Sequence, residues 1–184
     1  MRVIAGKFKG RSLFQPKDTA VRPTTDRVKE NIFNLIQFRV PGSAFLDLFG
    51  GSGAMSVEAA SRGAARIVTV DNSRESVALI KRNFDKVGVG REAQILETDY
   101  ASALKRSQGP FDIIFADPPY HADFYQDIFT AITAAHALKE EGILVFEHAT
   151  ERALPTVDGW ETIDTRKYGS VTVSILAQRE TANR

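Results

Sequence analysis

Short apolar runs alternate with segments of helical periodicity along this chain of 184 residues. The runs predict strands at 44–49, 66–71, 93–97, 111–116 and 143–147, and the intervening periodicity predicts helices near 53–62, 73–87, 100–106 and 123–138. Continuous apolar strands that alternate with helices are typical of a parallel sheet covered on both faces. The chain is therefore expected to fold as one compact α/β domain with a mostly parallel, doubly wound sheet.

Two further strand-like runs follow Pro155, at 160–166 and 171–178. Only residues 167–170 join them, and this link is too short to carry a crossover between parallel strands. We therefore expect an antiparallel hairpin that closes the sheet at the C-terminal end of the chain.

The segment after Pro23 has helical periodicity, and its Thr and Asp residues suit a first helical turn. Its expected apolar face consists of Val28, Ile32, Leu35 and Ile36.

Basic side chains are concentrated at the start of the chain. Residues 1–17 hold five of them and no acidic one, whereas the remainder carries 19 basic and 23 acidic side chains. Apolar residues on both sides of a glycine-containing turn predict a small β-hairpin, so we divide the chain into a basic arm at 1–20 and a domain at 21–184. The arm is suited to attract a polyanion; a solvated terminus is the alternative.

Composition excludes several classes of protein. The chain has no cysteine, and its three histidines lack ligand spacing, so neither a disulfide framework nor a metal site is expected. No apolar stretch approaches the length that crosses a bilayer, and the first residues lack the apolar core of a signal peptide. We expect a cytoplasmic protein without membrane contact.

A glycine-rich loop follows the first predicted strand, where open α/β sheets bind their ligands. A carboxylate just before these glycines would repel phosphate, but it can attract the cationic amino-acid portion of a cofactor such as S-adenosylmethionine. The expected cofactor contacts are Asp47, Phe49, Gly50, Gly51, Ser52 and Gly53 in this segment, and Asp71, Asn72, Asp99 and Tyr100 after the next two strands. Helix capping by Asp71 and a turn role for Asp99 are the alternatives.

The fourth strand runs into Asp117-Pro118-Pro119-Tyr120. The prolines remove amide donors and leave carbonyls free to accept hydrogen bonds. Asp117 and such a carbonyl can hold the two N–H groups of an exocyclic base amine, and Tyr120 can stack on the base. The target base would have to be unpaired or flipped out of its stack. A rigid turn is the alternative for this tetrapeptide, and helix packing is the alternative for Phe124 as part of the same cleft.

These segments together resemble the bacterial family of small-subunit ribosomal RNA (guanine-N2)-methyltransferases called the D family. The resemblance covers about residues 2–178 and rests on Arg2-Val3-Ile4-Ala5-Gly6, Gly10-Arg11, residues 22–30 with Phe33-Asn34, residues 47–53, Glu58, Ser61-Arg62, Asn83 and Asp117-Pro118-Pro119-Tyr120. Two features are less typical of the family, namely Gly50 in the loop and Tyr168-Gly169 in the C-terminal hairpin.

The resemblance implies a Rossmann-like class I methyltransferase fold with a seven-stranded sheet, S-adenosylmethionine as cofactor, and catalysis by residues 117–120. The partner would be ribosomal RNA or the assembling small subunit, bound by a monomer. Residues expected to contact this substrate are Arg2, Lys7, Lys9, Arg11, Arg22, Thr24, Arg27, Tyr120 and Phe124.

Four other functions are compatible with parts of the pattern. A DNA adenine-N6 methyltransferase can use the same tetrapeptide, but such enzymes usually need an added recognition region, and only 63 residues separate Gly53 from Asp117 and 64 follow Tyr120. A non-catalytic RNA-binding or assembly module would be expected to lose the pocket acid or the glycines, and both are present. A nicotinamide oxidoreductase is disfavoured by the glycine pattern. Methylation of a protein glutamine stays open.

Overall fold

A single seven-stranded sheet forms the centre of the molecule in the computed structural model, which describes residues 1–16, 25–106, 109–119 and 124–179. The strands are β1 (Ala44–Asp47), β2 (Arg66–Asp71), β3 (Ala93–Glu97), β4 (Phe111–Ala116), β5 (Leu138–Ala149), β6 (Trp160–Tyr168) and β7 (Val171–Gln178). Their order is β3-β2-β1-β4-β5-β7-β6; the first five are parallel, and β7 lies antiparallel between β5 and β6. The predicted parallel sheet with a C-terminal antiparallel hairpin is confirmed.

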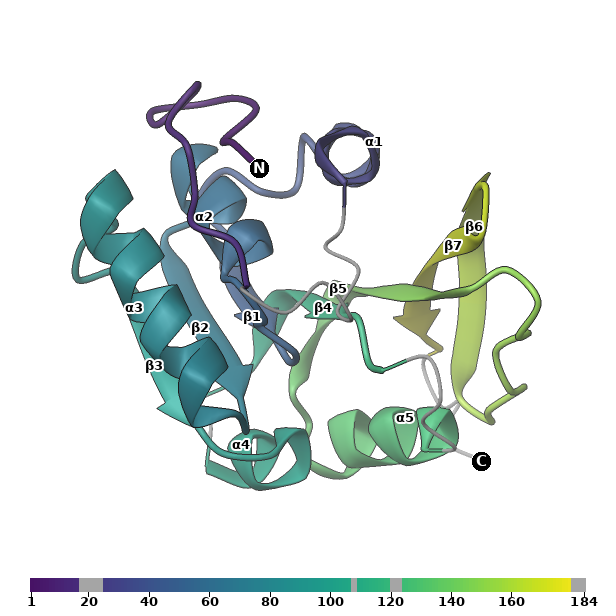
Figure 1. Cartoon of the computed structure of the whole chain (residues 1–184). Coiled ribbons are helices and arrows are strands. Elements are labelled where there is room, and N and C mark those ends of the chain that lie inside the picture. Colours follow the sequence, from purple (N-terminus) through teal and green to yellow (C-terminus); the bar gives the residue numbers. More distant parts are fainter. Residues whose placement is uncertain (17–24, 107–108, 120–123, 180–184) are drawn as a thin grey trace.

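Helices cover both faces of the sheet (Figure 1). On one face lie α1 (Asp26–Leu35), α2 (Ala54–Ser61) and α3 (Arg74–Val87), and on the other lie α4 (Tyr100–Arg106) and α5 (Tyr125–Ala134). Successive strand residues point to opposite faces, so Phe45 packs in the core under α1 to α3 and its neighbour Leu46 packs in the core above α4 and α5. No helix in the described ranges is long and apolar enough to cross a membrane.

The helix predicted at 123–138 is shorter than expected, and the last predicted parallel strand is longer. His136 adopts a left-handed conformation with φ of 47°, and the amides of His136 and Ala137 donate to the carbonyls of Thr133 and Ile132. This pair of bonds is a Schellman motif, which ends a helix. Leu138 therefore belongs to β5 and pairs with Phe111 of β4.

The first helix buries a different face from the one predicted. Thr25 caps α1 by accepting from the amide of Val28 at 3.3 Å, and Val28, Ile32 and Ile36 are buried as expected. Leu35, however, is 36% exposed, whereas Phe33 is fully buried and stacks on Phe45 with 6.2 Å between ring centroids. The prediction that Leu35 packs was wrong because the buried stripe is turned toward position 33.

The basic arm returns on itself, but it does not form a regular hairpin. Amides of Val3, Gly10 and Leu13 donate across the arm to carbonyls of Arg11, Val3 and Met1, yet only one bridge, between Arg2 and Ser12, has β geometry within the described part of the arm. Val3, Phe8 and Leu13 are buried in the core under α1 to α3. The arm is therefore packed on the domain; the predicted boundary at 20/21 lies outside the described residues.

Candidate active site

Three acidic residues lie at the carboxyl end of the sheet. Asp47 ends β1, while Asp117 and Glu147 follow directly on Ala116 and Phe146, which pair between β4 and β5. Residues two positions earlier on these strands, Phe45, Phe115 and Val145, all belong to the core under α1 to α3. Because strand side chains alternate, the three acids face that same side of the sheet, and we call them the carboxylate cluster.

Burial makes Asp47 and Asp117 of the carboxylate cluster hard to ionise. Asp47 is 1% exposed, and this burial, partly offset by the Ser56 hydroxyl that donates to Oδ2 at 3.0 Å, raises its pKa to about 7. Asp47 Oδ1 is buried and has no hydrogen-bond partner among the described residues. Burial, and then the nearby Glu147 and Asp47, raise the pKa of Asp117 well above its usual value. The cluster therefore favours a cationic ligand.

Within the described ranges, no group of three or more acidic, His or Cys side chains is arranged to hold a metal ion.

The glycine loop at 50–53 is held tightly against β2 and α3. The Gly50 amide donates to the Val70 carbonyl at 2.7 Å, and a Cβ at Gly50 would lie 2.6 Å from Thr69 Cγ2. Gly51 and Gly53 have φ values of +55° and +78°, which favour glycine. A side chain at Gly50 would therefore force its neighbours to shift. This close contact is a physical reason for Gly50, the loop residue that is less typical of the family.

Asp71 and Asp99 serve the local structure of the strand ends. Asp71 Oδ2 accepts the Gly51 amide and Oδ1 accepts the Ser73 amide, both at 2.8 Å. Asp99 Oδ1 accepts the Ser102 amide at 2.9 Å in the first turn of α4. The N-cap of α3 is Ser73 and not Asp71, so the capping alternative for Asp71 was wrong, whereas Asp99 caps the first turn of α4. Asn72 is exposed. The ribose and adenine contacts expected of these residues stay predictions.

An aromatic cluster made of Phe49, Tyr100 and Phe124 borders the glycine loop. The ring centroids are 5.7 Å apart for Phe49 and Tyr100, 5.5 Å for Tyr100 and Phe124, and 6.4 Å for Phe49 and Phe124. All three are partly buried against the core above α4 and α5. Sequence reasoning assigned the first two to the cofactor and Phe124 to the substrate, whereas the structure brings them into one stack that a planar ring could join.

The segment Asp117-Pro118-Pro119 follows β4 and begins in the carboxylate cluster. Asp117 is half-buried, Pro118 is buried and Pro119 is exposed. Tyr120 lies outside the described residues, as do Arg22 and Thr24. The catalytic role expected of Tyr120 and the substrate contacts expected of all three residues therefore stay predictions.

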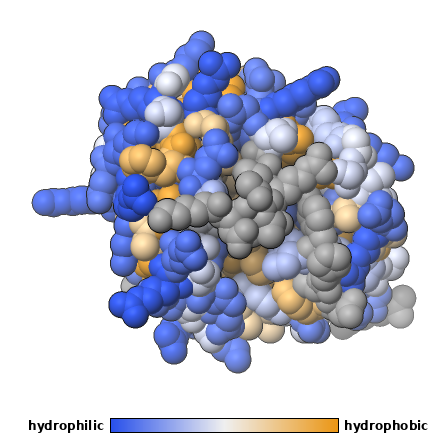
Figure 2. All heavy atoms as spheres, in the orientation of Figure 1, coloured by the Kyte–Doolittle hydropathy of each residue, from blue (hydrophilic) through white to orange (hydrophobic). Residues whose placement is uncertain are grey.

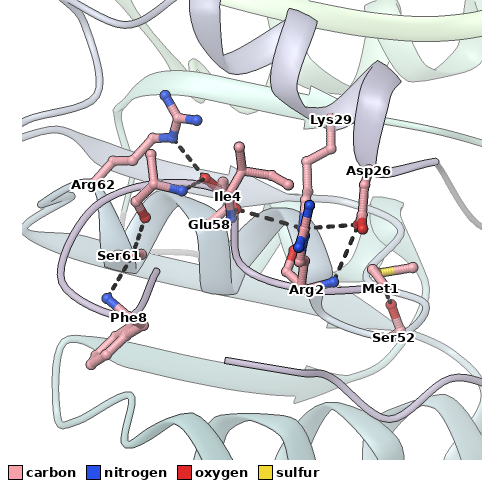
Figure 3. Close-up of polar contacts among 11 residues, drawn as sticks. Met1, Arg2, Ile4, Phe8, Asp26, Lys29, Ser52, Glu58, Ser61 and Arg62 are labelled. Atoms are coloured by element: carbon pink, nitrogen blue, oxygen red, sulfur yellow. Dashed lines mark hydrogen bonds and ion pairs between the residues drawn. The ribbon is translucent and has the colours of Figure 1, made fainter. Parts of the chain in front are cut away.

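A buried ionic network anchors the basic arm, and sequence reasoning missed it (Figure 3). Glu58 of α2 accepts the amides of Ile4 and Ala5 at 2.9 and 3.0 Å and the Arg62 guanidinium at 2.8 Å. Lys29 of α1 lies 3.5 Å from Glu58 and donates to the Arg2 carbonyl at 2.6 Å. Both Lys29 and Glu58 are fully buried, and burial lowers the pKa of Lys29. The sequence did hold one sign of this network: Glu58 is a charged residue within a predicted helix of mostly small and apolar residues.

The basic side chains of the arm differ in the contacts they make with the rest of the protein. Arg2, Lys7 and Lys9 are exposed, as is Arg27 on α1. Lys7 and Arg11 lie 5.1 and 5.2 Å from the centre of the Phe8 ring. Arg11 is exposed too, but it also donates to the Val87 carbonyl. Figure 2 shows a largely hydrophilic face with apolar side chains between the hydrophilic ones. Arg11 is therefore part of the arm's attachment as well as a candidate phosphate contact.

Comparison with known proteins identifies relatives along nearly the whole chain. The family model described as conserved hypothetical protein 95 matches residues 1–177. YlbH of Bacillus subtilis, provisionally named an rRNA methyltransferase, is 40% identical over 97% of this chain and 100% of its own length. Ribosomal RNA small subunit methyltransferase D of Escherichia coli is 31% identical over 98% and 90%. The solved structure of yhhF from Escherichia coli, provisionally named a methyltransferase, has a TM-score of 0.87 at 27% identity and covers 98% of this chain and 99% of its own.

Proposed function

This chain belongs to the family described as conserved hypothetical protein 95, and from that membership we propose that it is an S-adenosylmethionine-dependent methyltransferase of ribosomal RNA. Relatives named as rRNA methyltransferases match 97% and 98% of the chain. The similarity to these relatives therefore extends over both the domain and the arm.

The observation that carries the proposal is the carboxylate cluster beside the glycine loop. S-adenosylmethionine supplies an electrophilic methyl group on a sulfonium, and it also carries a cationic ammonium. The buried Asp47 Oδ1 has no partner among the described residues, and the space at Gly51 is open, since a Cβ there would meet nothing within 4 Å. Asp47 and residues 49–53 are proposed to hold the amino-acid portion of the cofactor.

The remaining cofactor contacts follow from the ends of β2 and β3. Both Asp71 oxygens already accept an amide, but a carboxylate has about four acceptor sites, so Asp71 can also accept from ribose hydroxyls, with Asn72 beside it. Asp99 keeps acceptor capacity beyond its capping bond for an adenine amine. Tyr100, in the aromatic cluster, is placed to line the same ring.

Asp117 is proposed to be the catalytic residue. An exocyclic base amine is a poor nucleophile, because its lone pair is delocalised into the ring. Asp117 and a carbonyl near Pro118 can each accept one N–H, which holds the nitrogen and directs its lone pair at the methyl group. Transfer of the methyl group would break its bond to the sulfonium, leave a neutral thioether, and give the nitrogen a proton to lose. Burial raises the pKa of Asp117, which makes its carboxylate a stronger acceptor for that proton.

The target is proposed to be the N2 amine of a guanine in small-subunit ribosomal RNA. The name of the Escherichia coli relative supports small-subunit ribosomal RNA as the substrate, and the choice of the guanine N2 amine rests on the family resemblance of the sequence motifs. The 63 residues between Gly53 and Asp117 leave no room there for a DNA-reading region. The proposed partner is ribosomal RNA or the assembling small subunit, bound in the cytoplasm by a monomer. The exposed Arg2, Lys7, Lys9, Arg11 and Arg27 are proposed contacts, as are Arg22, Thr24, Tyr120 and Phe124.

Transfer of a labelled methyl group tests the proposal. The protein is incubated with labelled S-adenosylmethionine and with undermethylated ribosomal RNA, small subunits or DNA, and the products are digested to nucleosides. Label in N2-methylguanosine from small-subunit RNA is the expected result. Label only in N6-methyladenine from DNA would overturn the choice of substrate, and no label in any nucleic acid would overturn the activity.

A further inference from the structure

Asn83 connects the basic arm to the glycine loop. It lies on α3, is fully buried, and uses both ends of its amide. Its Oδ1 accepts the Phe14 amide at 2.8 Å, while its Nδ2 donates to the Phe14 carbonyl at 3.1 Å and to the Ser52 carbonyl at 2.8 Å. One side chain thus holds the end of the arm and the centre of the glycine loop together.

The other end of the arm reaches the same loop residue. The Ser52 hydroxyl lies 3.8 Å from the Met1 sulfur (Figure 3), and the Leu13 amide donates to the Met1 carbonyl at 3.0 Å. Met1 and Phe14 of the arm are therefore both tied to Ser52. The middle of the arm is held elsewhere, because the Phe8 amide donates to the Ser61 hydroxyl of α2 at 2.9 Å.

We infer that Asn83 is a positioning residue through which the docked arm sets the conformation of the glycine loop and couples RNA binding to cofactor binding. This inference rests on the proposed function, because it takes the loop to be the cofactor site and the arm to be an RNA contact.

The physical reason is that the loop is short and has a glycine in a left-handed conformation on each side of Ser52. Gly51 and Gly53 adopt left-handed conformations, and glycine gives the unrestrained chain the largest freedom to leave them. A buried hydrogen bond to the carbonyl between these glycines removes that freedom. RNA that holds the arm against the domain restrains the same carbonyl, so by linkage each ligand tightens the binding of the other.

Asn83→Ala is the direct test, and Ser61→Ala is its matched control. Both residues are buried polar side chains that accept an arm amide, but only Asn83 also contacts the glycine loop. In methyl transfer assays, Asn83→Ala should raise KM for S-adenosylmethionine about tenfold with kcat changed less than about threefold, the size expected when one buried hydrogen bond is lost. Ser61→Ala should leave that KM within about twofold. Thermal unfolding establishes that both variants are folded.

Hydrogen exchange on the unmodified protein provides a second test that does not depend on the variants. Cofactor should slow exchange at the Leu13 and Phe14 amides at least about threefold, because Met1 and Asn83 tie them to Ser52, while the Phe8 amide, bonded to Ser61, should change less. Slowed exchange in residues 50–53 without any effect at Leu13 and Phe14 would overturn the inference and leave the proposed function intact. If wild-type protein does not bind S-adenosylmethionine at all, the proposed function fails instead.

Discussion

Replacing Asp47 by Asn is expected to stabilise the cofactor-free protein at neutral pH. Asp47 is 1% exposed, and burial, only partly offset by the Ser56 hydroxyl, raises its pKa from 3.8 to about 7. Asn has nearly the same shape and keeps an oxygen that can accept from Ser56. The substitution therefore removes the ionisation of this side chain with little change in packing.

The magnitude follows from the difference between the folded and unfolded pKa of this one carboxyl. Below about pH 4 the group is neutral in both states, so it costs nothing. As the pH rises toward 7, only the unfolded chain releases the proton, and the wild-type free energy of unfolding falls. Above about pH 7 the loss levels off near 4 kcal/mol, because each pKa unit corresponds to about 1.4 kcal/mol. The Asp47→Asn variant has no proton to release at this position, so its free energy of unfolding does not fall in this way.

Urea unfolding at about pH 5 and about pH 8 measures the effect. The stability advantage of Asp47→Asn should grow between these pH values, while its affinity for S-adenosylmethionine should fall, since the variant cannot place a negative charge against a cation. Asp112→Asn is the control: although burial works against ionisation, the Ala44 amide and the Lys139 ammonium lower the pKa of Asp112. The stability that this variant loses relative to wild type is therefore complete above about pH 4 and should not change between about pH 5 and about pH 8. A difference between Asp47→Asn and wild type that does not vary with pH would refute the reasoning.

Three other substitutions test the site and the arm. Asp117→Ala should bind S-adenosylmethionine within about threefold of wild type and lose about a hundredfold or more in kcat; undiminished methylation by this variant would contradict the proposed mechanism. The double substitution Lys7→Ala and Lys9→Ala should weaken RNA binding and reduce the log–log salt slope by roughly 0.7 to 0.9 for each phosphate that is no longer neutralised, and an unchanged slope would show that these two lysines do not contact RNA phosphates. Lys29→Ala should lower the free energy of unfolding in urea by about 3 kcal/mol, because it breaks a buried ion pair with Glu58; a loss under about 1 kcal/mol would show that this pair does not anchor the arm.

Local pattern in the sequence was sufficient for the sheet and for the ends of some of its strands. β2, β3, β4, α4 and β7 begin and end at the predicted residues, whereas β1 is shorter than predicted and β5 and β6 are longer. For β2 and β4 the reason is that a strand buried on both faces leaves a continuous apolar run between turn residues. Parallel strands all point the same way, so acids that follow β1 and β4 had to meet at one edge, as Asp47 and Asp117 do.

The limits of local pattern appear where a helix stops or turns. The Schellman motif at His136 ends α5 before the periodicity does, and the face that α1 buries depends on where Phe45 lies beneath it. Each outcome depends on a contact with a distant part of the chain. The end of α5 goes with the pairing of Leu138 in β5 with Phe111 of β4, and the buried face of α1 is set by Phe45 of β1.

The chain order and residue types alone were enough to indicate the α/β fold, the glycine loop and the acid before the two prolines, because each is encoded by neighbours in the sequence. Docking of the arm was not encoded in this way: Glu58 bonds the amide of Ile4 from 54 positions away, and Asn83 bonds Phe14 from 69. Burial was likewise settled in three dimensions. Lys29 resembles a solvated helix charge in the sequence, and only the closing of the arm and α1 over α2 removes it from water and gives it Glu58 as its partner.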